Sequence, residues 1–215
     1  ATNWALISAG GYHGTGNSHS MALKSDGTLW SWGSNQDDQL GDGSIFSRST
    51  PKQIGSETNW ALISAGVGYS MALKSDGTLW GWGENSFGRL GDGTTITKSI
   101  PTQIGSATNW ALISAGGDHT VALKSDGTLW AWGRNQFGQL GDGTTIAKSI
   151  PTQIGSETNW TLISAGGDHT VALKSNGTLW GWGENFHGEL GDGTTIHKNI
   201  PTQIGSATNW TAIAA

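Results

Sequence analysis

The sequence predicts an all-β fold, a β-propeller-type array of about four blades with four short strands in each. Three observations carry this prediction. The pair Asn-Trp recurs along the chain, a tryptophan-bearing hairpin follows each of its first four occurrences, and no segment shows helical periodicity of useful length. Four short strands in a repeat of about 50 residues are typical of a propeller blade.

The repeat is defined by the Asn-Trp pairs, which begin at Asn3, Asn59, Asn109, Asn159 and Asn209. The first spacing is 56 residues and the other three are 50, because unit one carries an insertion within residues 11–20. We therefore expect one domain over 1–215 that consists of units 3–58, 59–108, 109–158 and 159–208 and a partial closing strand 209–215.

Each unit opens with a short strand, which in unit three covers Trp110–Ala115. Successive side chains of a strand point to opposite faces. This alternation predicts that Trp110 and Leu112 lie on one face and that Ile113 and Ala115 lie on the other.

A hairpin follows the opening strand. Val121–Lys124 and Thr128–Trp132 are β-favouring runs separated by the turn pair Asp126-Gly127. Such a pair predicts a type I′ turn, in which both central residues have positive φ. Trp130 and Trp132 are two residues apart, so both indoles should leave the same face of the strand.

The remainder of the unit is a loop and an outer strand. Asn135–Ile150 is predicted to be a glycine-rich loop, and Pro151–Gly155 a fourth short strand. Proline has no backbone N–H to donate to a ladder, so its place at the start of this strand indicates an outer edge.

Composition and charge exclude several function classes. The net charge is -5 and no basic stripe is present, which disfavours nucleic-acid binding through phosphate neutralisation. The sequence contains no run of about 18 apolar residues, so no membrane span is predicted. It also contains no leading basic-then-apolar segment of the kind that indicates a retained signal peptide. With no cysteine, disulfides are excluded, but the compartment is left open.

The motifs of each unit resemble a known repeat, that of the regulator of chromosome condensation family. In unit three they are Gly117-x-His119-Thr120-x-Ala122-Leu123, Asp126-Gly127, Trp132-Gly133-x-Asn135, Gly138-x-Leu140-Gly141 and Pro151. This resemblance covers essentially the whole chain. It implies a ring of four-stranded blades, commonly seven, that serves as a binding platform.

The units differ from one another mainly in the loop after Trp-Gly. A rigid scaffold that presents variable loops is a common way to bind partners, and aromatic and arginine side chains are enriched at binding hot spots. The candidate binding residues in these rim loops are Gln36, Asp37, Asp38, Glu84, Phe87, Arg89, Arg134, Phe137, Glu184, Phe186, His187 and Glu189. Phe87 and Phe137 are the two that could instead pack inward.

Catalytic and metal-binding patterns are weak. His119 and His169 occupy equivalent places, but unit two has Tyr69 there, which favours a hydrogen-bonding role over metal ligation. His13 and His19 flank the insertion and could approach each other, although no third ligand is evident. We find no nucleophile motif or phosphate-binding loop, and we expect neither an enzyme nor a cofactor.

The sequence therefore predicts a non-catalytic scaffold that binds a protein through the rim loops. Two alternatives remain open. In one, the chain is a structural protein that assembles with itself, and a second chain completes an eight-bladed ring and covers the open edges. In the other, exposed aromatic side chains bind carbohydrate.

Overall fold

The computed structural model describes residues 3–11 and 16–215, which form sixteen strands. The first sheet contains β1 (Trp4–Gly10), β2 (His19–Lys24), β3 (Leu29–Gly33) and β4 (Arg48–Gln53). The second contains β5 (Trp60–Ala65), β6 (Tyr69–Lys74), β7 (Leu79–Gly83) and β8 (Lys98–Gln103). The third contains β9 (Trp110–Ala115), β10 (His119–Lys124), β11 (Leu129–Gly133) and β12 (Lys148–Gln153). The fourth contains β13 (Trp160–Ala165), β14 (His169–Lys174), β15 (Leu179–Gly183) and β16 (Lys198–Gln203).

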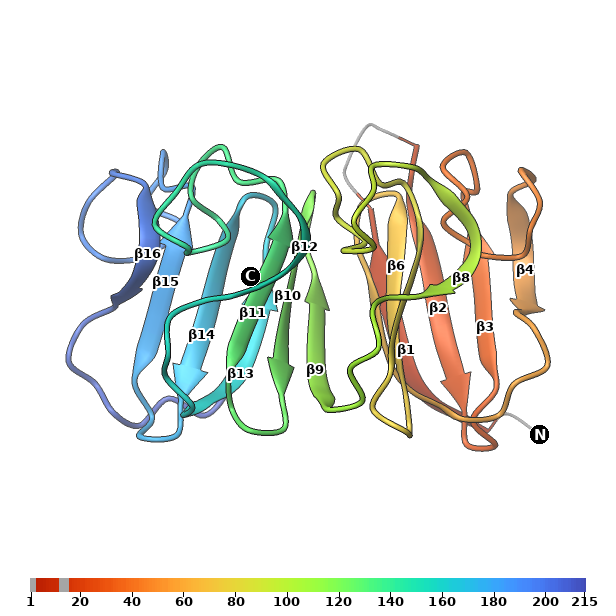
Figure 1. Cartoon of the computed structure of the whole chain (residues 1–215), viewed down its shortest axis with the longest axis horizontal. Helices are drawn as coiled ribbons and strands as arrows, with labels where there is room; N and C mark the ends of the chain where they lie inside the picture. The colour runs from red at the N-terminus through yellow and green to blue at the C-terminus, as the bar shows by residue number, and fades with distance from the viewer. Residues whose placement is uncertain (1–2, 12–15) are drawn as a thin grey trace.

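Each sheet is an antiparallel meander whose strands pair in chain order, as in β1-β2-β3-β4. The prediction of an all-β array of four-stranded blades is therefore confirmed, and we call the four sheets blades one to four (Figure 1). In each blade the strand that contains the proline, for example β12, forms an outer edge of the sheet, as expected. Within the described residues, no helix is long and apolar enough to cross a membrane.

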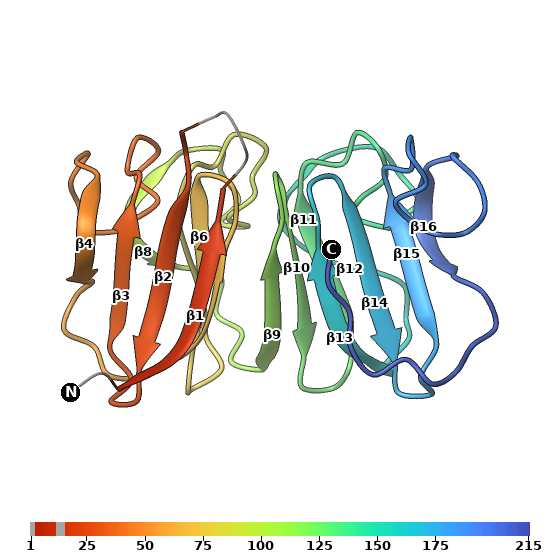
Figure 2. The same cartoon turned by 180° about the vertical axis from the view of Figure 1, so that it is seen from behind.

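The blades stand side by side around an axis formed by their first strands. β1 packs on β5, β5 on β9 and β9 on β13. At one end of the axis these strands converge on a cavity of about 320 Å³, which is lined by small residues that include Ala9, Gly66, Gly116, Gly166 and Ala215. Glycine and alanine fit this position because four strands approach one another there. Figure 2 shows the same four blades from behind.

The hairpin turn differs from the predicted type I′ turn. Gly127 has a φ of 78°, but Asp126 is not among the described residues with positive φ. The Gly127 N–H donates to the Lys124 carbonyl at 2.9 Å, and the Lys124 N–H donates to the Thr128 carbonyl at 3.1 Å. This pattern is a three-residue loop, a type I turn followed by glycine in the left-handed region. The Asp126 carboxylate accepts a hydrogen bond from the Thr128 hydroxyl and so supports this alternative turn.

The predicted alternation of the opening strand is wrong at its first residue. A register shift lies between Trp110 and Leu112 in the pairing of β9 with β10. As a result, Trp110 packs with Ile113 in the core between blades two and three, whereas Leu112 packs in the core between blades three and four. The extra residue of a β-bulge reverses the side-chain alternation at that point. Trp130 and Trp132 do share a face, since both rings contact Trp110, with centroid distances of 5.8 and 5.9 Å.

The core of the protein lies between the blades. At the junction of blades three and four, Val121 and Leu129 of blade three pack against Trp160 and Trp182 of blade four. Trp182 is fully buried. Burial of aliphatic and indole surface on both sides of each sheet is the main favourable term that holds consecutive blades together.

The C-terminal segment does not form the strand that the repeat predicts. None of residues 209–215 is assigned to a strand, although the Ala215 N–H donates to the Ser164 hydroxyl at 2.9 Å. The same contact joins Ala165 to Ser114 between blades three and four. The segment therefore lies where the first strand of a next blade would begin (Figure 2).

Candidate functional site

The loops that follow Trp-Gly all lie at one end of the strands, at the top in Figure 1. One buried asparagine organises each loop. In blade two, Oδ1 of the Asn85 side chain accepts a hydrogen bond from the Leu90 N–H at 3.0 Å. Nδ2 of the same side chain donates to the Asp92 carboxylate at 3.0 Å and to the backbone carbonyl of Thr94 at 3.1 Å. Because every polar atom of the buried amide is used, the loop is held in one conformation.

The structure places the twelve predicted rim residues at three depths. The exposed residues are Gln36, Phe87, Phe186 and His187. The half-buried residues are Asp37, Asp38, Glu84, Arg134, Phe137, Glu184 and Glu189. Arg89 is only 2% exposed and is therefore not presented on the surface.

Arg89 is the centre of an ion-pair chain that crosses the blades. Its Nη1 lies 3.0 Å from Glu84 Oε2 and 2.9 Å from Asp118 Oδ1. The second oxygen of Asp118 lies 3.0 Å from Nη1 of Arg134 in the third blade. Arg134 in turn lies 3.8 Å from Asp168 of blade four. The two arginines thus link three blades, and they are held by partners within the chain.

Sequence comparison of the units missed Asp118 and Asp168, because they lie before the second strand and not in the loop after Trp-Gly. Burial raises the pKa of the Asp168 carboxyl, while the neighbouring Arg134 opposes that change. Burial also raises the pKa of the Asp37 carboxyl, and the nearby Glu84 raises it further. The signal that could have identified this network is the difference between the units at one position, which is Gly68 in unit two but Asp118 and Asp168 in units three and four.

Two aromatic features reach the rim. Phe137, Phe186 and His197 form a cluster across blades three and four, with ring centroids 4.3 to 5.8 Å apart. Phe186 is 56% exposed, whereas Phe137 is half-buried beneath it. Phe87 is 43% exposed, and its ring lies 5.4 Å from the guanidinium of Arg134. Of the two phenylalanines for which inward packing was the alternative, Phe137 is half-buried and Phe87 is exposed.

Only one member of the histidine pair named as a weak metal-site candidate is described by the structure. His13 lies outside the described residues. His19 is 3% exposed, and its Nε2 is hydrogen-bonded to the Ser70 hydroxyl at 2.8 Å. Burial lowers the pKa of the His19 imidazole to about 4. Over residues 3–11 and 16–215, no group of three or more histidine, cysteine or acidic side chains could hold a metal ion.

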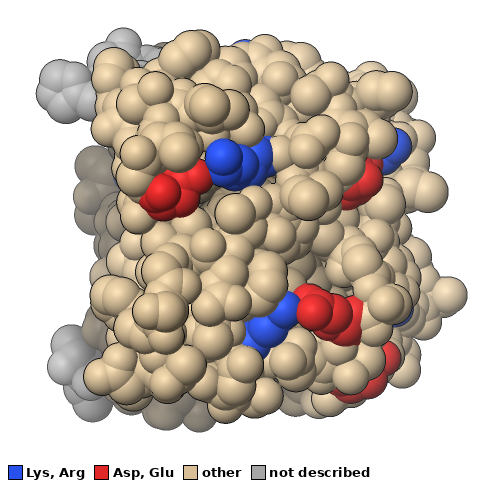
Figure 3. Space-filling model, turned by 90° about the vertical axis from the view of Figure 1, so that its left-hand side faces the viewer, with Lys and Arg blue, Asp and Glu red and all other residues tan. Residues whose placement is uncertain are grey.

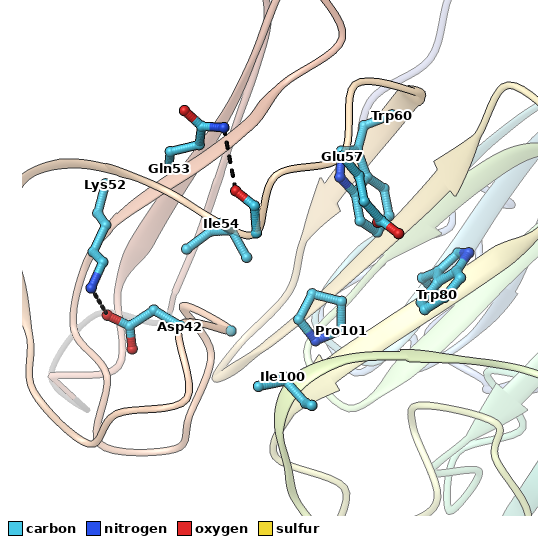
Figure 4. Close-up of a pocket in the computed structure, with 11 residues that line it drawn as sticks. Asp42, Lys52, Gln53, Ile54, Glu57, Trp60, Trp80, Ile100 and Pro101 are labelled. Atoms are coloured by element: carbon cyan, nitrogen blue, oxygen red, sulfur yellow. Dashed lines mark hydrogen bonds and ion pairs between the residues drawn. The ribbon is translucent and has the colours of Figure 1, made fainter.

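A groove of about 380 Å³ lies between blades one and two beside their outer strands β4 and β8, and it is lined by Asp42, Glu57, Trp80 and Pro101 among others (Figure 4). The acidic groups of its lining, Asp42 and Glu57, already have partners. Glu57 pairs with Lys74 at 2.8 Å, and the Lys74 ammonium lies 3.8 Å from the centroid of the Trp80 ring. An indole face covered by an ammonium is not available to stack on a sugar.

The surface near β16 carries few charges (Figure 3). The charged groups in this view lie as neighbouring acidic and basic residues. Lys198, the first residue of β16, is paired with Asp192 at 3.3 Å. This part of the described surface therefore offers no single-sign patch for a polyanion such as nucleic acid.

Comparisons with known proteins agree with this architecture. Residues 12–215 match the family described as RCC1-like domain. Among solved structures, the chain is similar to human WBSCR16, with a TM-score of 0.86 and 24% identity over 98% of this chain and 55% of that chain. It is also similar to Prp20p from Saccharomyces cerevisiae, with a TM-score of 0.82 and 24% identity over 94% of this chain and 50% of that chain.

A third structure, yeast RCC1 (Prp20) bound to Kap60, matches with a TM-score of 0.77 and 26% identity over 87% of this chain and 47% of that chain. The chain thus spans about half the length of the solved proteins it matches. No curated protein matches it in sequence.

Proposed function

The chain belongs to the RCC1-like domain family, and on this premise we propose that it is a non-catalytic scaffold that binds another protein through the rim at the Trp-Gly end of its strands. The observation that carries the proposal is the combination of a rigid rim with exposed aromatic side chains. Asn85 and its equivalents hold the loops, and these loops expose Phe87 and Phe186. Large aromatic side chains on a rigid support are typical hot spots of protein interfaces.

Two structures of one similar protein, Prp20 of yeast, support a protein partner as the class of ligand. Prp20p is described by its binding to Gsp1p and histones, and yeast RCC1 by its complex with Kap60. The rim of this chain differs in sequence between its own blades. The contact surface we propose consists of exposed rim residues of blades two and four: Phe87, Phe186 and His187. Arg89 is excluded from that surface because it is buried.

The test measures binding in two steps. Proteins retained by the immobilised chain are identified, and the purified partner is then titrated against variants by calorimetry. We expect Phe87→Ala or Phe186→Ala to weaken the affinity at least about tenfold. Ile100→Ala is the matched control, because Ile100 is 57% exposed but lies on the outer strand β8. Affinities of all three variants equal to that of the wild type would show that the partner does not use the rim.

A further inference from the structure

The first blade has one exposed apolar face. Trp4 is 42% exposed and Ile7 is 69% exposed, whereas their equivalents in blade two, Trp60 and Ile63, are 5% and 7% exposed. The difference arises because blade one covers that face of blade two. A pocket of about 360 Å³ opens on the uncovered face and is lined by residues of β1 together with side chains such as Trp32.

The fourth blade has the complementary face. In the third blade, Val121 and Leu129 are fully buried because they cover Trp160 of the next blade. Their equivalents in blade four are Val171 and Leu179, which are only half-buried. The two ends of the array therefore carry the two halves of the same interface that already occurs three times inside the chain.

A polar contact accompanies each internal interface. A ring at the start of the second strand hydrogen-bonds to a hydroxyl of the next blade over 2.8 to 3.1 Å, in the pairs His19–Ser70, Tyr69–Thr120 and His119–Thr170. The next ring in this series is His169, and the hydroxyl at the other end is Ser20. Among the described residues, neither of these two side chains has a hydrogen bond of this series.

We propose that a second copy of this chain docks head to tail on these faces, so that blade four of each copy packs on blade one of the other. Val171 and Leu179 of one copy then cover Trp4 and Ile7 of the other, and His169 reaches Ser20. A head-to-tail contact made twice closes a ring. Two copies of four blades give eight, which is within the range of about four to eight blades that propellers adopt.

The C-terminal segment occupies part of this face. The backbone N–H of Trp210 donates to the Gly177 carbonyl at 3.2 Å, and the residue is 46% exposed. By contrast, β1 is paired with β2 over six register positions from Trp4 to Gly10. Because β1 is part of an intact sheet and the segment has no ladder, blade one of the second copy displaces the segment.

The mass of the wild-type chain in solution is the first test. Sedimentation equilibrium or light scattering over a concentration series should show a rise from 22.4 kDa to twice that mass. A mass that stays at 22.4 kDa up to about 100 μM would overturn the proposal, since interfaces of this kind are expected to bind at micromolar concentrations or below. Growth beyond two copies would also overturn it, because the contacts would then form an open chain and not a ring.

Two matched variants test whether the contact lies on the exposed face of blade one. Ile7→Glu puts a charge on the face of blade one, where the side chain is 69% exposed in the single chain, so folding should be unaffected. Burying this unpaired charge should weaken dimerisation about 100-fold or more. Ile146→Glu introduces the same charge on a loop of blade three where the side chain is 66% exposed, and it should leave the dimer intact. Equal dimerisation of Ile7→Glu and wild type would refute the contact.

Mixing variants tests the head-to-tail geometry. Ile7→Glu and Val171→Glu should each weaken dimerisation about 100-fold or more on their own, because each change damages both interfaces of a symmetric ring. A mixture of the two still offers one undamaged interface, between blade four of the Ile7→Glu chain and blade one of the Val171→Glu chain. A dimer should therefore reappear in the mixture, with weaker affinity than wild type. No dimer in the mixture, although both chains are folded by circular dichroism, would contradict a head-to-tail contact.

Discussion

The hydroxyl of Tyr69 donates a hydrogen bond of 2.6 Å to the carbonyl oxygen of His119, across the junction of blades two and three. Tyr69 and His119 occupy equivalent positions in successive units, as the first residues of β6 and β10. The side chain at this position in blade two therefore donates to the backbone carbonyl at the same position in blade three. A phenol in this position stays protonated near neutral pH, and burial raises the pKa of Tyr69 still further above its ordinary value. An imidazole in the same position behaves differently.

The stability of the protein should fall on acidification because of its buried histidines. Burial, with a smaller effect from His169, lowers the pKa of His119 from 6.5 to about 3. Between these two pH values the unfolded chain binds a proton that the folded chain does not bind, so the free energy of unfolding decreases as the pH falls. The slope should reach about 1.4 kcal/mol per pH unit for this histidine.

His119→Tyr provides the matched variant, since tyrosine already occupies this place in blade two. Urea unfolding of the wild type and the variant at pH values from 7 to 4 should show a shallower decrease for the variant. Parallel curves would show that His119 accepts a proton in the folded protein, contrary to its lowered pKa.

Arg89 should contribute more to stability than Arg134, although both belong to the same ion-pair chain. The side chain of Arg89 is 3% exposed and that of Arg134 is 26% exposed. Arg89→Leu leaves Glu84 and Asp118 without their buried partner and should cost about 3 kcal/mol of the free energy of unfolding. Arg134→Leu should cost less than about 1 kcal/mol, as for a solvent-accessible pair. Equal losses in urea titrations would argue against a buried charge at Arg89.

The ordered conformation of each rim loop should depend on the side-chain amide of its buried asparagine, such as Asn85. Asn85→Ala removes the acceptor for the Leu90 N–H and leaves buried loop groups unpaired, at a cost of about 2 to 3 kcal/mol. Ser86→Ala, next to it but exposed, should change the stability by less than about 0.5 kcal/mol. Amide hydrogen exchange of residues 86–96 provides the local readout, and it should accelerate in Asn85→Ala alone.

Removing the C-terminal segment should strengthen self-association. Residues 208–215 lie on the face that the second copy uses, so a chain that ends at Ala207 has no competitor for that face. The dimer should therefore form at a lower concentration than in the full chain, as measured by sedimentation equilibrium. A higher dissociation constant for the shortened chain would indicate that the segment belongs to the contact and is not displaced from it.

Short-range sequence patterns were sufficient for much of the architecture. The Asn-Trp repeat located the four blades, the β-favouring runs located the hairpin strands, and Pro151 located an outer edge. These features depend on neighbours within one unit, such as the turn around Gly127. Even there, the turn type was wrong, because the choice between two turns depends on the position of a bulge that composition does not encode.

Features that require a neighbouring blade were decided by tertiary structure. Comparison of the units shows that Arg89 differs from Gln39 and Gln139 in the same loop position, and this difference made it a candidate for binding. Only the folded array brings Asp118 of the next blade within 2.9 Å of it and so removes it from the surface. In the same way, Trp4 and Trp60 are identical in local sequence context, yet one is exposed and the other is buried. The physical reason is that burial belongs to the contact between two blades, whereas sequence patterns describe one blade at a time.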